Sequence, residues 1–338
     1  MNACVITTYR CNAKCHMCDI WQHPTRKEDE ITPDIVAKLP SGLGRVNLTG
    51  GEPMLRDDIE DFVKILREKA ELVEISTNGY FTDKIIKIAE KYPTKVMFRI
   101  SIEGLPKLND ELRGMKDGFD HALRTVLELG KTKVKDYGFS IVICDKNAAD
   151  LLSVYELCSR MGIEFGNSTM HNSWYFHKYD NKLEDKELAI RTEREFIKAL
   201  LQSRRKNLIM RVKDWLRAYF NLNILSHLEE TGNILESCCA GTDLFFVDPF
   251  SNLLPCNGTD EQWIMGNLKK QSWNEIWNSE RANEIRSRVS KCGRDCAFIG
   301  TARFDMKRHP LKPISWILKN KIRLKTNKDI VVSAGLHF

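Results

Sequence analysis

The sequence lacks the features that would assign it to membrane, secreted or repetitive proteins. No apolar run approaches the ~20 residues that a membrane-spanning helix requires. Residues 1–9 do not combine a charged stretch with a long apolar one, so they do not predict a signal peptide. The chain also has no internal repeat and no low-complexity segment. We therefore expect a globular protein that stays in the cytoplasm.

Charge and cysteine content narrow the class further. The 338 residues are 42% hydrophobic and 29% charged, which argues against global disorder. The formal net charge of +6 favours an anionic partner, but this charge alone does not choose among a phosphorylated small molecule, nucleic acid and a lipid surface. Of these partners we do not expect nucleic acid. Eleven cysteines without a signal peptide indicate metal or cluster ligation in a reducing compartment rather than a disulfide scaffold.

Strand and helix patterns alternate over the first half of the chain. The strands are expected at residues 3–8, 45–49, 72–76, 96–102, 137–143 and 163–169, and helices at 57–70, 82–92, 120–130 and 149–161. Strand, helix, strand repeated in this way predicts an α/β fold with a parallel sheet of right-handed crossover units. Six such units make a partial (β/α)6 barrel that resembles a TIM barrel but stays open.

The rest of the chain divides by composition. Residues 1–182 form the expected barrel, and residues 183–234 form a helical linker with a charged helical pattern at 183–220. Residues 235–304 form a small cysteine-containing domain, with two short strands joined by a turn at 248–252 and a helix at 273–279. Residues 305–338 form a basic tail. Its apolar and basic residues at 316–325 fit either an ordinary packed helix or a segment that lies on an anionic membrane.

Three cysteines near the N-terminus, Cys11, Cys15 and Cys18, are the most informative residues. They follow the first expected strand, at the carboxyl end where barrel active sites gather. Three thiolates on one short loop can hold three irons of a [4Fe-4S] cluster and leave the fourth iron open for chemistry. A zinc site with His16 or His23 as fourth ligand is the alternative.

Polar motifs follow the next three strands. They are Gly50-Gly51-Glu52-Pro53 after the second strand, Asn78 after the third, and Ser101 and Glu103 at the end of the fourth. Carboxyl ends of parallel strands meet at one mouth, so we expect these groups to face it together. The glycines permit close approach to a ligand, and the Glu52 carboxylate can accept from an ammonium group; a plain turn is the alternative.

The C-x3-C-x2-C spacing after an apolar strand, followed by the glycine motif at the second strand, resembles the radical S-adenosylmethionine (SAM) enzymes. The resemblance implies that SAM chelates the open iron and is cleaved reductively to a 5'-deoxyadenosyl radical, which takes hydrogen from a substrate. It implies SAM contacts from the motifs at the strand ends and from Met17, whose thioether can pack against adenine. Arg113 resembles an arginine that reaches the methionine carboxylate, and a solvated loop arginine is the alternative.

A second group of cysteines lies near the C-terminus. A hairpin with a cysteine at each end, a helix and a C-x3-C loop can bring together Cys239, Cys256, Cys292 and Cys296. Spacing alone fits structural zinc and an iron–sulfur cluster equally. After a radical SAM core, the arrangement resembles the Twitch module, a shortened relative of the SPASM module. This implies one auxiliary [4Fe-4S] cluster with an electron-transfer role, in which Cys238 could replace Cys239.

A polar and aromatic run after the sixth strand supplies candidates for substrate contact. His171, Asn172 and His177 are expected at the barrel mouth, against the alternative that the run is an ordinary loop. The expected electron donor is a flavodoxin- or ferredoxin-type protein, and the basic tail is expected to touch a membrane surface weakly.

We therefore predict a radical SAM oxidoreductase-type enzyme. The expected substrate is a small molecule or a sugar- or lipid-linked intermediate that undergoes oxidation, epimerisation or bond formation. One alternative is a maturase of a ribosomally made peptide, which we rank lower because the barrel pattern begins at residue 3 and leaves no N-terminal leader-binding domain. Another alternative is a zinc-stabilised binding protein without enzymatic activity.

Overall fold

A computed structural model describes residues 1–232, 234, 238–293 and 296–332. The chain divides into two compact units. The first comprises Met1–Ile141, Met170–Lys182 and Ala240–Cys292, and the second comprises Val142–Thr169, Leu183–Cys239 and Gly293–Phe338. Over the described ranges, no helix combines the length and the apolar character needed to cross a membrane.

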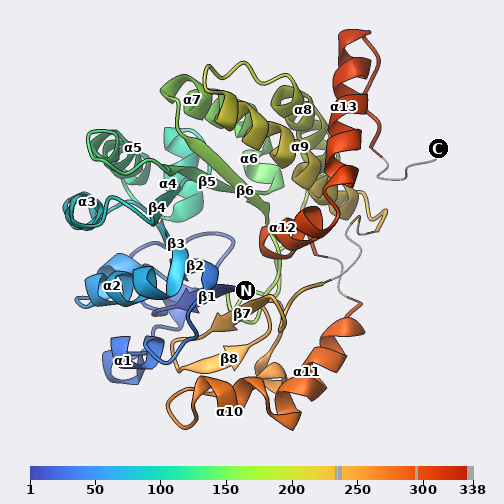
Figure 1. The fold of residues 1–338 in the computed structure, drawn as a ribbon. Helices are drawn as coiled ribbons and strands as arrows, with labels where there is room; N and C mark the ends of the chain where they lie inside the picture. Colours follow the sequence, from blue (N-terminus) through green and yellow to red (C-terminus); the bar gives the residue numbers. More distant parts are fainter. Residues whose placement is uncertain (233, 235–237, 294–295, 333–338) are drawn as a thin grey trace. The chain divides into compact units, whose positions relative to one another are not determined.

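An open sheet forms the centre of the first unit (Figure 1). Its strands, in spatial order, are β5 (Tyr137–Ile143), β4 (Val96–Ser101), β3 (Ala70–Thr77), β2 (Leu43–Thr49), β1 (Asn2–Ile6), β7 (Leu244–Val247), β8 (Asn252–Leu254) and β9 (Gly266–Asn267). The pairs from β5 to β7 are parallel, and the last two pairs are antiparallel. Parallel strands joined by helices in a sheet that does not close confirm the predicted partial barrel.

Helices connect these strands. They are α1 (Pro33–Val36), α2 (Ile59–Lys69), α3 (Thr82–Lys91), α4 (Pro106–Arg113), α5 (Gly118–Leu129), α10 (Trp273–Trp277) and α11 (Glu280–Ser290), with 3-10 turns at η1 (Ile20–Gln22), η2 (Lys27–Asp29), η3 (Pro53–Leu55) and η4 (Glu261–Trp263). In α2, Ile59, Phe62 and Leu66 recur at three- and four-residue spacing and are fully buried, so one face of the helix packs on the sheet. The sequence prediction omitted α4, which supplies part of the candidate site.

The hairpin of β7 and β8 continues the main sheet. Strand β7 lies parallel to β1, with Phe245 opposite Ala3. The turn expected at 248–252 is present, and the buried Asp248 closes it by accepting hydrogen bonds from the Asn252 backbone N and Nδ2, each at 2.8 Å. Burial raises the pKa of Asp248 to about 6, although the hydrogen bonds from Asn252 act in the opposite direction. The first strand is therefore flanked on both sides, by β2 and by β7.

The second unit is mainly helical. It contains β6 (Glu164–Thr169), α6 (Asp145–Ala148), α7 (Leu151–Met161), α8 (Lys186–Leu201), α9 (Leu208–Leu228), α12 (Ile299–Arg308) and α13 (Leu311–Lys325). The charged pattern at 183–220, expected to form one helix or a pair, forms the pair α8 and α9. Tyr155, Phe165 and Phe196 from α7, β6 and α8 form an aromatic cluster with ring centroids 5.5 to 5.9 Å apart.

The basic tail is helical and packed on its own unit. The ring of Trp316 in α13 lies 5.7 Å from that of Tyr219 in α9, and its Nε1 donates to the Val331 carbonyl at 2.9 Å. Asn320, one turn further along α13, is fully buried. Residues 316–325 therefore lie in a helix with one packed face, as the first of the two sequence alternatives expects.

One buried carboxyl group gives this unit a pH-dependent stability. Glu193 on α8 is fully buried, and among the described residues neither of its oxygens has a hydrogen-bond partner. Burial raises the pKa of Glu193 well above its usual 4.5. As the pH rises above 4.5, Glu193 loses its proton in the unfolded chain before it does so in the folded protein. The folded state therefore loses stability progressively above pH 4.5.

We expect Glu193→Gln to remove this loss. Above the ordinary titration range of a glutamate, the difference in unfolding free energy between the variant and the wild type should grow in favour of the variant. The growth should be at most about 1.4 kcal/mol per pH unit. Urea denaturation at a series of pH values measures this difference. Glu187→Gln, at an exposed position on the same helix, should show the same dependence of unfolding free energy on pH as the wild type. Parallel curves for Glu193→Gln as well would contradict the assignment.

Candidate functional site

The cysteine loop, residues 11–18, follows β1 at the carboxyl edge of the sheet and is anchored by the end of α4. The backbone N of Lys14 donates to the Arg113 carbonyl at 2.9 Å, and the backbone N of His16 donates to the Leu112 carbonyl at 2.7 Å. Gly114 ends α4 with a φ of 54°, and a Cβ there would lie 2.6 Å from the Lys14 carbonyl oxygen. A glycine is therefore required for α4 to reach the loop this closely.

The three cysteines of this loop are partly buried. Burial raises the pKa of Cys11 and that of Cys18 to about 12, and it also raises the pKa of Cys15. The thiols are near enough that the charge of Cys15 adds to the rise at both of the others. Cationic iron is the natural counter-charge for three thiolates in such a site. In the parts of the chain that the structure describes, no three His, Cys, Asp or Glu side chains are grouped as a single metal ion would require.

Arg113 supplies a buried positive charge beside the thiols. It is the last residue of α4 and is buried, so the alternative of a solvated loop arginine is wrong. Its Nη1 donates to Glu103 Oε1 at 3.1 Å, and the charges of Cys15 and Glu103 help to raise its pKa, although burial acts in the opposite direction. Within the described residues its Nε is buried without a hydrogen-bond partner. An unpaired guanidinium N–H next to three thiols fits an anionic ligand group such as a carboxylate.

The glycine motif packs against the start of the cysteine loop. A Cβ on Gly50 would lie 2.5 Å from the Thr8 carbonyl oxygen. A Cβ on Gly51 would lie 2.3 Å from the Arg10 carbonyl oxygen. The backbone N of Gly51 donates to Thr8 O at 2.7 Å, and that of Glu52 donates to Arg10 O at 2.9 Å. The sequence interpretation assigned the glycines to close approach of a ligand. The structure shows that they first allow close approach of two backbone segments.

Glu52 binds the end of β3 to this motif. Its carboxylate is fully buried and accepts from Thr77 Oγ1 at 2.7 Å, from the Asn78 backbone N at 2.7 Å and from the Met54 backbone N at 3.0 Å. Burial raises the pKa of Glu52, although all three donors oppose the rise. A carboxylate has about four lone-pair positions, so about one remains for a further donor such as an ammonium group. Pro53 follows as the first residue of η3.

The remaining predicted SAM contacts lie at neighbouring strand ends. Asn78 Nδ2 donates to Asn12 Oδ1 in the cysteine loop at 2.7 Å. The Glu103 backbone N donates to Asn109 Oδ1 at 2.8 Å, which holds the carboxylate near Arg113. Ser101 ends β4 opposite Ser140 and is half-buried. Asn78, Glu103 and Arg113 are thus brought directly to the cysteine loop or to its anchor.

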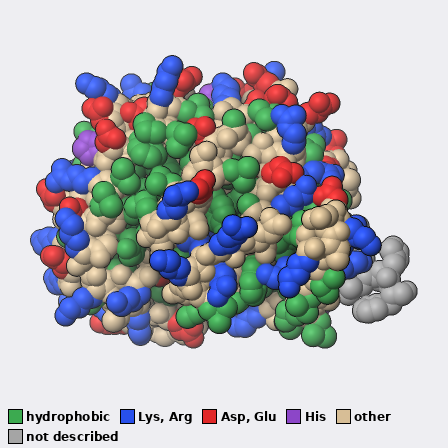
Figure 2. Space-filling view, turned by 90° about the horizontal axis from the view of Figure 1, so that it is seen from above, with side chains coloured by type: hydrophobic (Ala, Val, Ile, Leu, Met, Phe, Trp, Pro, Cys, Tyr) green, Lys and Arg blue, Asp and Glu red, His purple; other side chains and the backbone are tan. Residues whose placement is uncertain are grey.

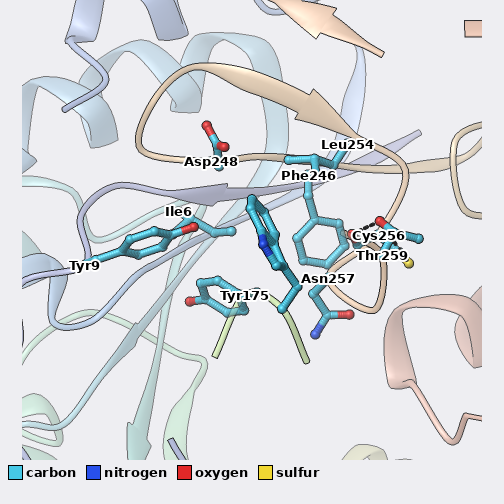
Figure 3. Close-up of a pocket in the computed structure, with 10 residues that line it drawn as sticks. Ile6, Tyr9, Tyr175, Phe246, Asp248, Leu254, Cys256, Asn257 and Thr259 are labelled. Carbon is cyan, nitrogen blue, oxygen red and sulfur yellow. Dashed lines mark hydrogen bonds between the residues drawn. The ribbon is translucent and has the colours of Figure 1, made fainter. Parts of the chain in front are cut away.

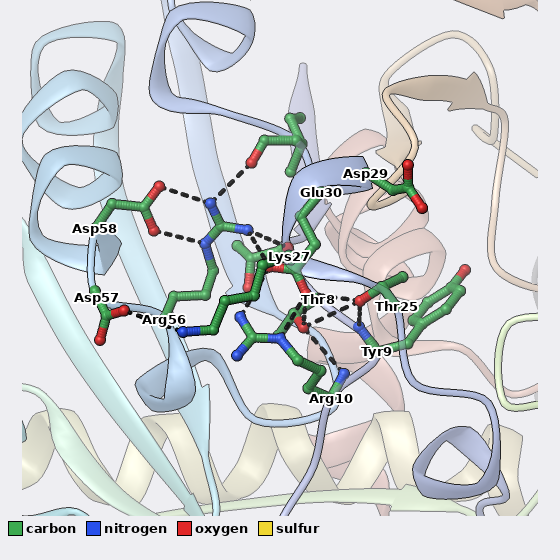
Figure 4. A network of polar contacts seen from close by, with 12 residues as sticks. Thr8, Tyr9, Arg10, Thr25, Lys27, Asp29, Glu30, Arg56, Asp57 and Asp58 are labelled. Atoms are coloured by element: carbon green, nitrogen blue, oxygen red, sulfur yellow. Dashed lines mark hydrogen bonds and ion pairs between the residues drawn. The ribbon is translucent and has the colours of Figure 1, made fainter.

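A buried ion network that the sequence analysis missed fixes the end of β1 (Figure 4). The Glu30 carboxylate accepts from Arg10 Nε at 2.8 Å, from Arg56 Nη1 at 2.9 Å and from Thr25 Oγ1 at 2.7 Å. Arg56 also donates to the Thr7 carbonyl at 2.8 Å. Burial alone would raise the pKa of Glu30, but the hydrogen bonds hold it below its usual range. The network fixes the backbone immediately before Cys11.

The predicted substrate contacts have different surroundings. Asn172 is paired with Asn181: its Nδ2 donates to the Asn181 carbonyl at 3.1 Å, and the Asn181 backbone N donates back to Oδ1 at 2.9 Å. Asn181 in turn donates through Nδ2 to the carbonyl of the buried Met17 at 3.1 Å. Asn172 therefore organises a loop that contacts the cysteine loop.

The two histidines are placed differently. His177 has a φ of 51°, and its ring stacks on His23 at 4.4 Å. Burial lowers the pKa of His177. The Nε2 of His171 lies 3.4 Å from Asn257 Nδ2.

An aromatic pocket connects the glycine motif with the hairpin (Figure 3). It is lined by Ile6, Tyr9, Trp174, Tyr175, Phe246, Asp248, Leu254, Cys256, Asn257 and Thr259. Tyr175 Oη donates to the Gly50 carbonyl at 3.1 Å. A predicted auxiliary ligand, Cys256, therefore lines the same pocket as a side chain that contacts the predicted SAM motif.

The late cysteines are divided between the two units. Cys256 and Cys292 belong to the first unit, and Cys239 and Cys296 belong to the second. Cys239 is buried and its neighbour Cys238 is exposed. The assignment of all four ligands to one auxiliary cluster stays a prediction.

Two family matches cover the two groups of cysteines. Residues 5–158 match the radical SAM superfamily. Residues 238–297 match the SPASM family, described as an iron–sulfur cluster-binding domain.

Curated relatives differ in how much of the chain they cover. The Fe-coproporphyrin III synthase of Methanosarcina barkeri is 27% identical over 204 residues, which is 59% of this chain and 50% of that protein. The chain thus matches half the length of that relative. The pre-heme d1 synthase of Dinoroseobacter shibae is 24% identical and covers 88% of this chain and 80% of its own. The sporulation killing factor maturation protein SkfB of Bacillus subtilis is 22% identical, and the match covers 84% of this chain and 66% of SkfB.

Solved structures share the fold. SuiB of Streptococcus suis, bound to SAM, superposes with a TM-score of 0.64 at 17% identity over 85% of this chain and 67% of its own. The anSMEcpe structure with SAM and the Cp18Cys peptide gives a TM-score of 0.62 at 15% identity, over 94% and 99% of the two chains. At this identity both matches establish the fold alone.

The contact between the glycine motif and the cysteine loop can be tested by Gly51→Ala. The added Cβ must displace the Arg10 carbonyl, so the cysteine loop loses its position. After anaerobic reconstitution we expect the variant to lose about four irons per chain, measured by iron assay. Gly44→Ala, near the start of the strand β2 that precedes the glycine motif, serves as control because the nearest atom to its Cβ is a side-chain oxygen of Asn2 at 3.1 Å. Equal iron content in the two variants would refute the contact.

Proposed function

Because the chain is a radical SAM superfamily enzyme with a SPASM iron–sulfur domain, we propose that it cleaves SAM reductively and modifies a peptide by hydrogen abstraction. The carrying observation is the cysteine loop with its three partly buried cysteines, held against the glycine motif by backbone contacts. [4Fe-4S] clusters and SAM are the cofactors that these two domains use. Cys11, Cys15 and Cys18 would hold the front cluster, which when bound would supply the electron for reductive cleavage of SAM.

The side chains around the loop divide the work of holding SAM. Cys11, Cys15 and Cys18 would ligate three irons. The unpaired Nε of Arg113 would bind the methionine carboxylate, and the remaining lone-pair position of Glu52 would accept from the ammonium group.

Shielding of the site from water supports radical chemistry. The side chains of Ala13 and Met17 in the cysteine loop are buried. The loop that carries Asn181 covers the Met17 carbonyl, and the Asp19 backbone N donates to the Phe176 carbonyl at 2.9 Å. These contacts hold the 171–181 segment against the cysteine loop. A closed site limits side reactions of a reactive intermediate.

A peptide substrate is supported by the relatives. SkfB, whose name records maturation of a sporulation killing factor, matches 84% of this chain. SuiB has been solved with its precursor peptide SuiA and superposes with a TM-score of 0.63. These similarities favour the peptide alternative over the small-molecule, sugar- or lipid-linked substrate ranked first from the sequence. A small molecule is the second candidate, since the pre-heme d1 synthase match covers most of both chains.

Cluster content and SAM cleavage test the reaction class. We expect the anaerobically reconstituted wild type to carry about eight irons per chain and to form 5'-deoxyadenosine with dithionite. Replacing Cys11, Cys15 and Cys18 together by Ala should leave about four irons and abolish the product. Cys158→Ala, at a buried cysteine of α7, should keep both properties. About four irons in the wild type would refute the auxiliary cluster, and zinc without SAM cleavage would refute the enzyme.

The substrate class is tested by comparing two strains. One expresses the wild type and the other expresses Cys15→Ala, and peptide and metabolite fractions of both are analysed by mass spectrometry. We expect a short peptide whose mass changes only with the active enzyme. When that peptide is deuterated, 5'-deoxyadenosine formed in vitro should acquire the deuterium. A changed small metabolite with an unchanged peptide fraction would favour the second candidate instead.

A further inference from the structure

Helix α13 of the second unit carries an apolar stripe on its outer face. Leu311, Ile314, Leu318 and Ile322 recur at three- and four-residue spacing and are 78%, 48%, 57% and 64% exposed. This spacing places them along one side of the helix. The opposite side is the one that packs on the unit, through Trp316 and the other buried residues of the helix. The outer stripe therefore contributes nothing to the core.

Basic side chains flank this stripe on both sides. Helix α13 contains five Lys or Arg residues and no Asp or Glu. At 3.6 residues per turn, Lys312 and Lys319 fall on one side of the stripe and Lys321 on the other, and Lys325 continues the stripe at the end of the helix. Lys321 lies with Nζ 3.6 Å from the centre of the Trp215 ring of α9. An aliphatic stripe flanked by lysines is typical of helices that lie in a membrane interface.

The start of α9 extends the same surface chemistry. Leu208, Ile209, Val212 and Leu216 are 60%, 68%, 40% and 38% exposed. A groove in this region is lined by Leu201, Gln202, Ser203, Arg204, Arg211, Trp215, Lys321, Leu324 and Lys325, with no acidic residue among them. The two helices run antiparallel, because Trp316 meets Tyr219 while Lys321 meets Trp215. On the face drawn in Figure 2, hydrophobic and basic side chains are likewise intermingled.

We propose that this surface, formed by the outer stripe of α13 and the first two turns of α9, binds an anionic lipid bilayer. The apolar side chains would enter the acyl boundary, and the lysines would extend to the phosphate groups above them. A lipid surface fits better than an acidic protein because the exposed stripe consists of Leu and Ile with lysines around it, whereas protein interfaces favour aromatic residues seated in pockets. The helix would lie on the membrane without crossing it.

Vesicle flotation with the full-length holoenzyme tests this surface. We expect binding to vesicles of equal parts phosphatidylglycerol and phosphatidylcholine, little binding to phosphatidylcholine alone, and weaker binding at high salt. Leu318→Ser with Ile322→Ser, and separately Lys319→Glu with Lys325→Glu, should each lower the bound fraction about tenfold or more. Leu127→Ser, at a 53% exposed leucine of α5, should bind like the wild type.

The outcomes separate this surface from the reaction. All four changed side chains are exposed, so circular dichroism and SAM cleavage should match the wild type in every variant. Equal binding by the wild type and both double variants would overturn the proposal, as would equal binding to neutral and anionic vesicles. Self-association without lipid that is lost in the Leu318→Ser, Ile322→Ser variant would assign the stripe to a second copy of the chain and would also overturn it. The proposal would also be overturned if anionic vesicles did not bind and an acidic protein bound through the same lysines.

Discussion

The contact between the glycine motif and the end of β1 is the constraint on which the rest of the site depends. Gly50 and Gly51 leave no room for a Cβ against the backbone of Thr8 and Arg10, and the two segments exchange hydrogen bonds there. This contact sets where the chain leaves the sheet, and hence where Cys11 begins the cysteine loop. It also sets the position of Glu52, which connects to the end of β3. The cysteines and the carboxylate that we propose as ligands for the iron and for SAM thus depend on one shared piece of backbone.

Buried carboxylates maintain this arrangement at a desolvation cost that their donors offset. Glu30 and Glu52 are both buried, and each accepts at least three hydrogen bonds. Two arginines neutralise Glu30. Among the described residues the hydrogen-bond donors to Glu52 are neutral, and burial raises its pKa although these donors and the charge of Arg113 act in the opposite direction. Removing a partner from such a group leaves an uncompensated buried charge, which costs several kcal/mol. Glu52 is therefore the carboxylate that gains most from a cationic ligand group.

Local patterns predicted the elements whose signals lie within a few residues. The strands were predicted from their apolar runs. The spacing of Cys11, Cys15 and Cys18 predicted the family, and their role as iron ligands stays a prediction. The network of Glu30 and Arg56 could not be predicted in this way, because charged residues 26 positions apart carry no periodic signal. The pairing of β7 with β1 joins segments about 240 residues apart and depends on the whole sheet. Helix α4 is short, and its signals, Pro106 at its start and Gly114 at its end, were present but were not combined.

Helix α13 shows why a pattern can carry two meanings at once. Leucine and isoleucine occur on both of its faces, so neither the packed helix nor the membrane-facing helix could be excluded from sequence. The structure resolves the inner face, where Trp316 and Asn320 are buried against the unit. A helix that served only to pack would have gained solubility from polar residues on its outer face, as amphipathic surface helices do. Retention of four exposed aliphatic side chains between lysines therefore requires a separate explanation, and an anionic lipid surface satisfies both the apolar and the charged residues.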